Sequence, residues 1–142
     1  MSMARPEAND ERCPCGSGRR HADCCAPCLA GDTPAPTAEA LMRSRYAAYV
    51  LEHEGYLLET WHPETRPTSL DLNAGQKWLG LKVLRSEQGK ERDDEGLVEF
   101  VARFKIDGRG HRLHEISRFE RVDGRWRYLD GERGPTDSSL RR

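Results

Sequence analysis

The sequence predicts an α+β domain, in which helices pack on one face of an antiparallel sheet, preceded by a small N-terminal zinc knuckle. Three observations support this prediction. Apolar residues recur at helical spacing early in the chain, and further on the period changes to the two-residue alternation of strands. An Asp-Gly pair between two expected strands predicts a hairpin, and all five cysteines lie between residues 13 and 28. Helices followed by a meander of antiparallel strands are typical of the α+β class.

The composition fits one domain with a modest core. The chain has 142 residues, of which 36% are hydrophobic and 33% are charged. Its formal net charge of -1 lacks the bulk basicity of a dedicated nucleic-acid-binding protein. No run approaches the roughly 18 apolar residues of a transmembrane helix, and the hydrophilic N-terminus lacks the apolar core of a signal peptide. We therefore expect a cytoplasmic protein without a membrane segment, whose thiols stay reduced.

The cysteines are grouped as metal ligands rather than as a disulfide framework. One pair is separated by a single residue, and an adjacent pair follows after eight intervening residues. Four thiolates satisfy the tetrahedral preference of zinc, at zinc–sulfur distances of about 2.3 Å. Residues 19–25 are expected to form a short helical turn that brings the second pair back to the first. The predicted ligands of a structural zinc ion are Cys13, Cys15, Cys24 and Cys25.

This segment closely resembles the SEC-C motif, which is known from the C-terminal tail of the SecA preprotein translocase and from many bacterial proteins. The cysteine spacing agrees, and so does the Gly-Ser-Gly turn at residues 16–18, where glycine permits positive φ angles. The resemblance implies a zinc-binding motif over residues 12–29. It assigns the ligand roles to the same four cysteines.

Two alternatives to this ligand set stay open. His21 or Cys28 could replace one of the four ligands. The cysteines could instead form an unmetallated redox cluster in which the adjacent pair oxidises. Outside the zinc site, Cys28 would behave as a small half-buried hydrophobe. Four available thiolates argue against a catalytic zinc, which keeps an open coordination position.

The rest of the chain divides into a linker, one domain and two disordered ends. Residues 1–11 and 133–142 are expected to be disordered, and residues 30–37 form a linker marked by prolines and a glycine. The domain spans residues 38–132, with no internal repeat.

The domain begins with two predicted helices. Thr37 is a suitable N-cap for the first, over residues 38–53. Its apolar residues at helical spacing are Met42, Tyr46, Tyr49 and Val50. Gly55 interrupts this helix, and a second short helix is expected over residues 56–61, before Pro63.

Four strands complete the domain. They are predicted over residues 78–84, 97–106, 112–122 and 125–129. One face of the second strand carries Val98, Phe100, Ala102, Phe104 and Ile106. Asp123-Gly124 predicts a two-residue hairpin turn that pairs Val122 with Arg125.

The domain resembles the bacterial YchJ proteins, an uncharacterised family. The resemblance covers roughly residues 12–132, and the strings that carry it are LMRSRYAAYV, TWHPETRP, WLGLKVL, VEFVARF, HEISRF and GRWRYLDG. It implies a SEC-C motif followed by a cone-shaped domain of the nuclear transport factor two-like type, whose curved sheet wraps around a pocket. Many relatives end in a second SEC-C motif, whereas this chain has no cysteine after Cys28.

The leading functional expectation is a non-enzymatic interaction module. The SecA tail, which the motif resembles, binds a chaperone and the ribosome, so the resemblance implies docking of the zinc knuckle on a protein or ribosomal partner. An equally weighted interpretation is that zinc only staples the N-terminus to the domain. Nucleic-acid binding through Arg12, Arg19 and Arg20 is less favoured because the net charge is near neutral.

The alternative is a small-molecule-binding or catalytic domain that uses the pocket of the cone. The candidates on its strands are Glu99, Arg103 and Glu115, which Arg45 of the first helix could join. A desolvated carboxylate there could act as a general base. The candidate lining residues are Trp61, His62 and Trp78. Glu and Arg on neighbouring strands more often form ion pairs, and no nucleophile-plus-base motif or phosphate loop is present, so the sequence favours a role other than catalysis.

Overall fold

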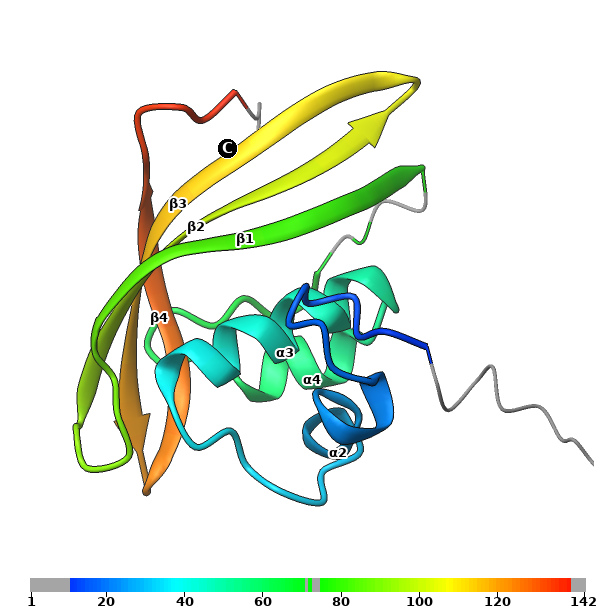
Figure 1. The fold of residues 1–142 in the computed structure, drawn as a ribbon. Coiled ribbons are helices and arrows are strands. Elements are labelled where there is room, and N and C mark those ends of the chain that lie inside the picture. The colour runs from blue at the N-terminus through cyan, green and yellow to red at the C-terminus, as the bar shows by residue number, and fades with distance from the viewer. Residues whose placement is uncertain (1–10, 71, 73–74, 139–142) are drawn as a thin grey trace, which may run out of the picture.

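The computed structural model describes residues 11–70, 72 and 75–138. Within this part of the chain, four antiparallel strands form one curved sheet in the order β1-β2-β3-β4, with the helices on one of its faces (Figure 1). The helical elements are η1 (His21–Asp23), α2 (Ala26–Leu29), α3 (Ala38–Val50) and α4 (Glu54–Glu59). The strands are β1 (Gln76–Gln88), β2 (Glu95–Ile106), β3 (Arg109–Val122) and β4 (Arg125–Arg133). The predicted α+β class is confirmed.

The helix α3 starts where the sequence predicts and ends earlier. The hydroxyl of Thr37 accepts a hydrogen bond from the Ala40 amide at 3.0 Å, as expected of an N-cap. The helix stops at Val50 because Glu52 turns into the left-handed region at a φ of 58°. His53 is then the N-cap of α4, so the first predicted helix ends three residues early, at Val50 rather than residue 53, and the second begins two residues early, at Glu54 rather than residue 56. None of the described helices has the length and apolar character needed to cross a membrane.

The strands pair as the turn residues predict and extend further than their apolar patterns. Val122 pairs with Arg125 across a turn in which Asp123 and Gly124 both have positive φ, at 54° and 82°. Strand β1 continues to Gln88 through charged residues, beyond the predicted end of this strand at residue 84. Charged side chains on the outer face do not end a strand when they pair across it.

The core lies between α3 and the inner face of the sheet. The predicted inner face of β2 is confirmed, since Val98, Phe100, Ala102 and Phe104 are all buried. Phe119 and Trp126 are each 1% exposed, and the Trp126 indole donates to the Pro36 carbonyl oxygen at 3.2 Å. The linker before α3 is therefore hydrogen-bonded to β4, the last strand of the sheet.

The end of the described chain differs from its prediction. The sequence predicts disorder from residue 133, but residues 133–138 continue from β4 and return along β3. The Gly134 amide donates to the His114 carbonyl oxygen at 2.7 Å, and the Ser138 amide donates to the Arg112 carbonyl oxygen at 2.8 Å. These bonds join residues distant in sequence, which local composition cannot reveal. The rest of that predicted tail, 139–142, and residues 1–10 of the predicted disordered N-terminus lie outside the described residues.

Candidate metal centre and cavity

Four cysteine sulfurs converge on one point in the N-terminal segment. The Sγ atoms of Cys13, Cys15, Cys24 and Cys25 all lie within 4.8 Å of one another. The sulfurs of Cys15 and Cys24 are 3.6 Å apart, those of Cys24 and Cys25 are 3.9 Å apart, and none forms a disulfide. Four sulfurs in a tetrahedron, each about 2.3 Å from a central zinc ion, lie about 3.8 Å from one another. The cluster therefore has the dimensions to hold a metal ion.

Two glycines and a short helical turn build this cluster. Gly16 and Gly18 have φ angles of 82° and 84°, which glycine adopts without strain. The chain then returns, and the Cys13 amide donates to the Arg19 carbonyl oxygen at 2.8 Å. The 3-10 turn His21–Asp23 lies within the predicted helical turn and delivers the second cysteine pair.

The cysteine cluster is buried against the rest of the fold. Cys15 is fully buried, and its carbonyl oxygen accepts a hydrogen bond from Nη1 of Arg43 on α3 at 2.8 Å. Ala47, one turn further along α3, is also fully buried and packs against the cysteines. A Cβ atom on Gly16 would lie 2.9 Å from the Leu81 carbonyl oxygen of β1. The segment thus packs against α3 and β1 and does not project from them.

The two alternative ligands lie outside this cluster. His21 Nδ1 is 3.3 Å from the Cys13 sulfur, but His21 is not part of the group whose ligand atoms are all within 4.8 Å. Cys28 packs instead against the apolar cluster of Ala48, Tyr56 and Leu57. Burial raises the pKa of its thiol, as expected of a cysteine that serves as a hydrophobe.

The crowded sulfurs share their protons unequally. The side-chain hydrogen bond with Cys15 raises the pKa of Cys13 to about 11. Hydrogen bonds from Cys13 and then Cys25 hold the pKa of Cys15 well below its usual range. One thiolate is therefore favoured, and its neighbours donate to it. A divalent cation would replace those shared protons.

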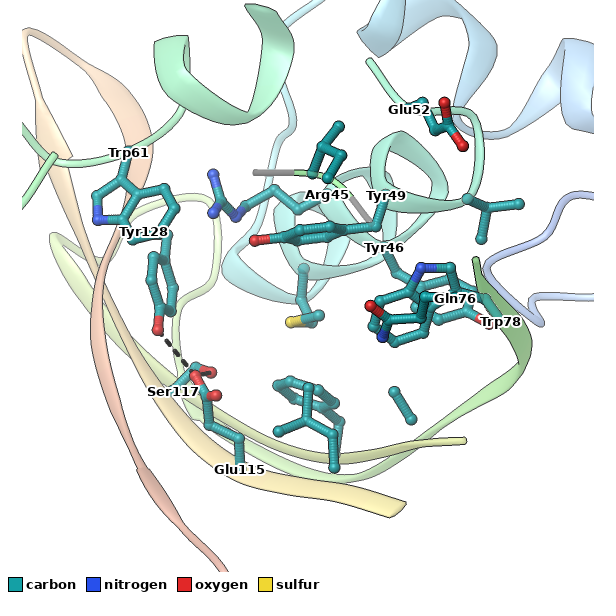
Figure 2. A pocket seen from close by; sticks show the side chains of 16 residues that line it. Arg45, Tyr46, Tyr49, Glu52, Trp61, Gln76, Trp78, Glu115, Ser117 and Tyr128 are labelled. Atoms are coloured by element: carbon teal, nitrogen blue, oxygen red, sulfur yellow. Dashed lines mark hydrogen bonds between the residues drawn. The ribbon is translucent and has the colours of Figure 1, made fainter. Parts of the chain in front are cut away.

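A second feature is a cavity between α3 and the inner face of the sheet (Figure 2). Its volume is ≈ 200 Å³, and its walls combine aromatic and aliphatic side chains with a few polar groups. Two charged side chains line it deep in the fold: Arg45 is 4% exposed and Glu115 is 3% exposed. Buried charges are rare unless they are paired or used, so these two residues define the polar character of the cavity.

Arg45 is held between α4 and two aromatic rings. Its Nη1 donates to the Leu57 carbonyl oxygen at 2.8 Å and to the Thr60 hydroxyl at 2.7 Å. Its guanidinium carbon lies 5.0 Å from the ring centroid of Trp61 and 4.7 Å from that of Tyr128. Desolvation lowers the pKa of Arg45, because the surroundings replace only part of the lost hydration.

Glu115 enters the cavity from β3. Its Oε2 accepts hydrogen bonds from the Ser117 hydroxyl at 2.7 Å and from the Tyr128 hydroxyl at 2.9 Å. A Cβ atom on Gly131 of β4 would lie 2.1 Å from the same oxygen, so this position must lack a side chain. The carboxylate is therefore fixed by three neighbouring positions on two strands.

The structure brings together only some of the predicted pocket residues. Glu115 and Arg45 line the cavity with Trp61 and Trp78. Glu99 and Arg103 do not, because they alternate with the inward residues of β2 and lie on the outer face of the sheet. There Glu99 accepts from Arg85 at 2.8 Å and lies 2.6 Å from His114 Nε2.

One further pocket prediction is wrong, and one residue of the cavity was not predicted. His62 does not line the cavity, and its Nε2 lies 3.4 Å from Glu120. Tyr128 was missed, although its two-residue spacing from Trp126 placed both side chains on one face of the strand.

Comparisons with known proteins agree with this architecture. Residues 37–131 match the family described as "YchJ, middle NTF2-like domain", and residues 11–27 match the SEC-C motif. A UPF0225 protein of Chromobacterium violaceum is 60% identical over 123 residues, which are 84% of this chain and 90% of that protein. One of Deinococcus radiodurans is 55% identical over 119 residues, covering 83% of this chain and 86% of that protein.

Two solved structures resemble the fold. One is the solution structure of a SEC-C motif containing protein from Rhodopseudomonas palustris. It has a TM-score of 0.76 and 41% identity, and the match covers 86% of this chain and 98% of that chain. The other is the crystal structure of a SEC-C motif containing protein from Psychrobacter arcticus. Its TM-score is 0.71 at 29% identity, covering 95% of this chain and 87% of that chain.

Proposed function

The chain belongs to the YchJ family, in which a SEC-C motif precedes an NTF2-like domain, and from this premise we propose that its four clustered cysteines bind one structural zinc ion. The observation that supports the proposal is the convergence of four sulfurs within 4.8 Å in a buried position. All four tetrahedral positions are then filled by protein sulfur. No position is left for a substrate, which is the arrangement of a structural site.

The zinc ion acts as a staple in this proposal. Among the described residues, the cysteines of the cluster are joined only by the buried Ala47 of α3 and the partly buried Leu29, so the segment has little apolar surface of its own. Zinc–thiolate bonds replace that missing core. The hydrogen bond from Arg43 to the Cys15 carbonyl oxygen then fixes the cage to α3. The ion therefore holds the N-terminal segment against the domain.

Metal analysis of two matched variants tests the zinc proposal. The parent chain is expected to contain about one zinc ion, and Cys15→Ser is expected to lose it because one thiolate of the four is removed. Cys28→Ser is the control, since Cys28 lies outside the cluster. Zinc retained in full by Cys15→Ser, or lost equally from Cys28→Ser, would contradict the assignment.

Docking of the zinc segment on a protein or ribosomal partner is a second candidate function. It is favoured by the exposed outer turn of the segment, where Gly18, Arg19 and Arg20 face solvent. The test is co-sedimentation of the zinc-loaded chain with purified ribosomes, compared with an Arg19→Glu, Arg20→Glu double variant. Arg103→Glu, on the outer face of the sheet, is the control for general loss of positive charge. Equal co-sedimentation of the three chains would reject ribosome docking through this turn.

A further inference from the structure

The Arg45 guanidinium has donors to spare inside the cavity. Both of its hydrogen bonds come from Nη1, and within the described part of the chain Nε and Nη2 make none. Figure 2 shows the guanidinium reaching into the space beside Trp61, Tyr128 and Tyr49. A cation buried to this degree gains when an anionic or accepting group supplies charge-assisted hydrogen bonds. This end of the cavity therefore offers hydrogen-bond donors to an anionic group of a ligand.

The Glu115 carboxylate forms the opposite end. Figure 2 shows it on the sheet side of the cavity, across from the helix that carries Arg45. The hydrogen bonds from Ser117 and Tyr128 both reach Oε2. Because this buried carboxylate lies on the cavity wall, its charge favours a cationic or N–H group on a ligand. This end selects an ammonium or another N–H group.

The rest of the cavity suits an apolar body. Trp78, Phe100 and Leu113 line it, and its ≈ 200 Å³ exceeds the roughly 150 Å³ of an apolar cavity that admits benzene. Glu52 is exposed and lines the same cavity, so the cavity reaches solvent beside it. A small molecule can therefore both enter and fit.

The two charges decide which ligand is favoured. Arg45 and Glu115 sum to zero, and a ligand with a single charge would satisfy one of them while facing repulsion from the other. From this geometry we infer that the cavity binds a small zwitterion, whose carboxylate meets Arg45, whose ammonium meets Glu115 and whose apolar body fills the rest of the cavity. An amino acid with an apolar side chain is the simplest member of this class.

A set of four matched probes tests this inference on the full zinc-loaded chain. L-Phenylalanine carries both charged groups, 3-phenylpropanoate only the carboxylate, 2-phenylethylamine only the ammonium, and ethylbenzene neither. Dissociation constants are measured by titration calorimetry, with perturbed tryptophan NMR signals to locate the probe. Phenylalanine is expected to bind most tightly, and the loss of either charged group is expected to weaken binding about tenfold or more.

A charge-removing variant separates the two ends. Glu115→Gln keeps the shape of the side chain and is expected to weaken phenylalanine and phenylethylamine about tenfold while sparing 3-phenylpropanoate. Glu99→Gln is the matched control, since Glu99 lies on the outer face of the same sheet. Arg45→Met examines the other end. Because Arg45 also anchors Leu57 and Thr60, this variant loses stability as well, and Glu115→Gln carries the test by itself.

Three outcomes would overturn the inference. If 3-phenylpropanoate binds the parent chain as tightly as phenylalanine, the site recognises anions alone. If ethylbenzene binds the parent chain as tightly as phenylalanine, the cavity recognises only apolar surface. If phenylalanine at millimolar concentration perturbs neither tryptophan of the cavity, the zwitterion site does not exist. Each result is independent of the zinc proposal, because the ion lies in a separate cluster.

Discussion

A missing side chain at Gly131 makes room for the buried carboxylate of Glu115. The position opposite Gly131 on β3 is Ser117, which donates to that carboxylate, so the strand pairing brings the three residues together. A methyl group at this position would overlap Glu115 Oε2, Cδ and Cγ, at 2.1, 2.6 and 2.8 Å. The orientation of one buried charge thus depends on the smallest residue in the chain.

Gly131→Ala is therefore expected to displace Glu115 and break its hydrogen bonds to Ser117 and Tyr128. Leaving buried polar groups without partners costs about 1–3 kcal/mol, so the free energy of unfolding should fall by that amount. Urea denaturation measures it. Gly110→Ala is the control, since a methyl group there would meet nothing within 4 Å and its φ is not positive. Equal stability of the two variants would refute the steric argument.

The sequence predicted individual side chains only where spacing alone places them. The cluster of four cysteines was readable because thiols that can share one metal ion recur at short, characteristic spacings. The faces of β2 and β3 were also readable, but their relative register was not. Phe100 pairs with Glu115, which places Glu115 on the inner face, whereas Glu99 pairs with Ile116 on the outer one. The register is set by the two-residue turn Asp107-Gly108, which pairs Ile106 with Arg109, whereas the predicted strands left residues 107–111 between them. The predicted grouping of Glu115 with Arg103 did not form.

At the scale of elements, the segment after β4 is held along β3 by backbone hydrogen bonds and by the side chain of His114. The Thr136 amide donates to His114 Nδ1 at 3.1 Å, so Nε2 carries the proton and donates to Glu99 at 2.6 Å. Arg85 of β1 donates to the other oxygen of Glu99 at 2.8 Å. Helices and strands were predictable from their periods, but this segment was not, because most of its hydrogen bonds join it to β3, which is distant in sequence.

Acid is expected to weaken this outer network through Glu99. The hydrogen bond from His114, followed by that from Arg85, lowers the pKa of Glu99 below its ordinary 4.5. A depressed carboxyl pKa adds stability that is fully present above the unfolded value and is lost as pH falls through the folded value. The stability advantage of the parent chain over Glu99→Gln should therefore shrink below pH 4.5.

Urea denaturation from neutral pH to about pH 3 checks this expectation. Glu87→Gln is the control, because it removes the exposed second partner of Arg85 and leaves His114 intact. If the difference between the parent chain and Glu99→Gln stays constant across the whole range, Glu99 does not supply the pH dependence.

At the scale of the whole molecule, the N-terminal segment and the domain have separate cores. The segment packs around its cysteines and Ala47, whereas the domain buries Leu41, Phe119 and Trp126 in another cluster. The helix α2 connects them, since Cys28 and Leu29 pack on the apolar group around Tyr56. Because the domain has this second cluster, we expect it to fold without the metal.

Metal removal is accordingly expected to loosen the segment while the domain stays folded. Trypsin should cleave faster after the exposed Arg19 and Arg20 once a chelator is present, and peptides from residues 38–133 should keep the protection that they have in the zinc-loaded chain. Mass spectrometry of timed digests gives both rates. Loss of protection throughout the chain at a single rate would show that the fold depends on the metal as one unit.

The position of Gly16 beside β1 has a further consequence. β1 is an edge strand of the sheet. Gly16 approaches the carbonyl oxygen of Leu81, which belongs to this strand. An uncovered edge strand is a template for pairing with another chain, and the exposed Leu79 and Leu84 increase that hazard here. The N-terminal segment therefore shields part of a sheet edge, and metal starvation would uncover a surface prone to aggregation.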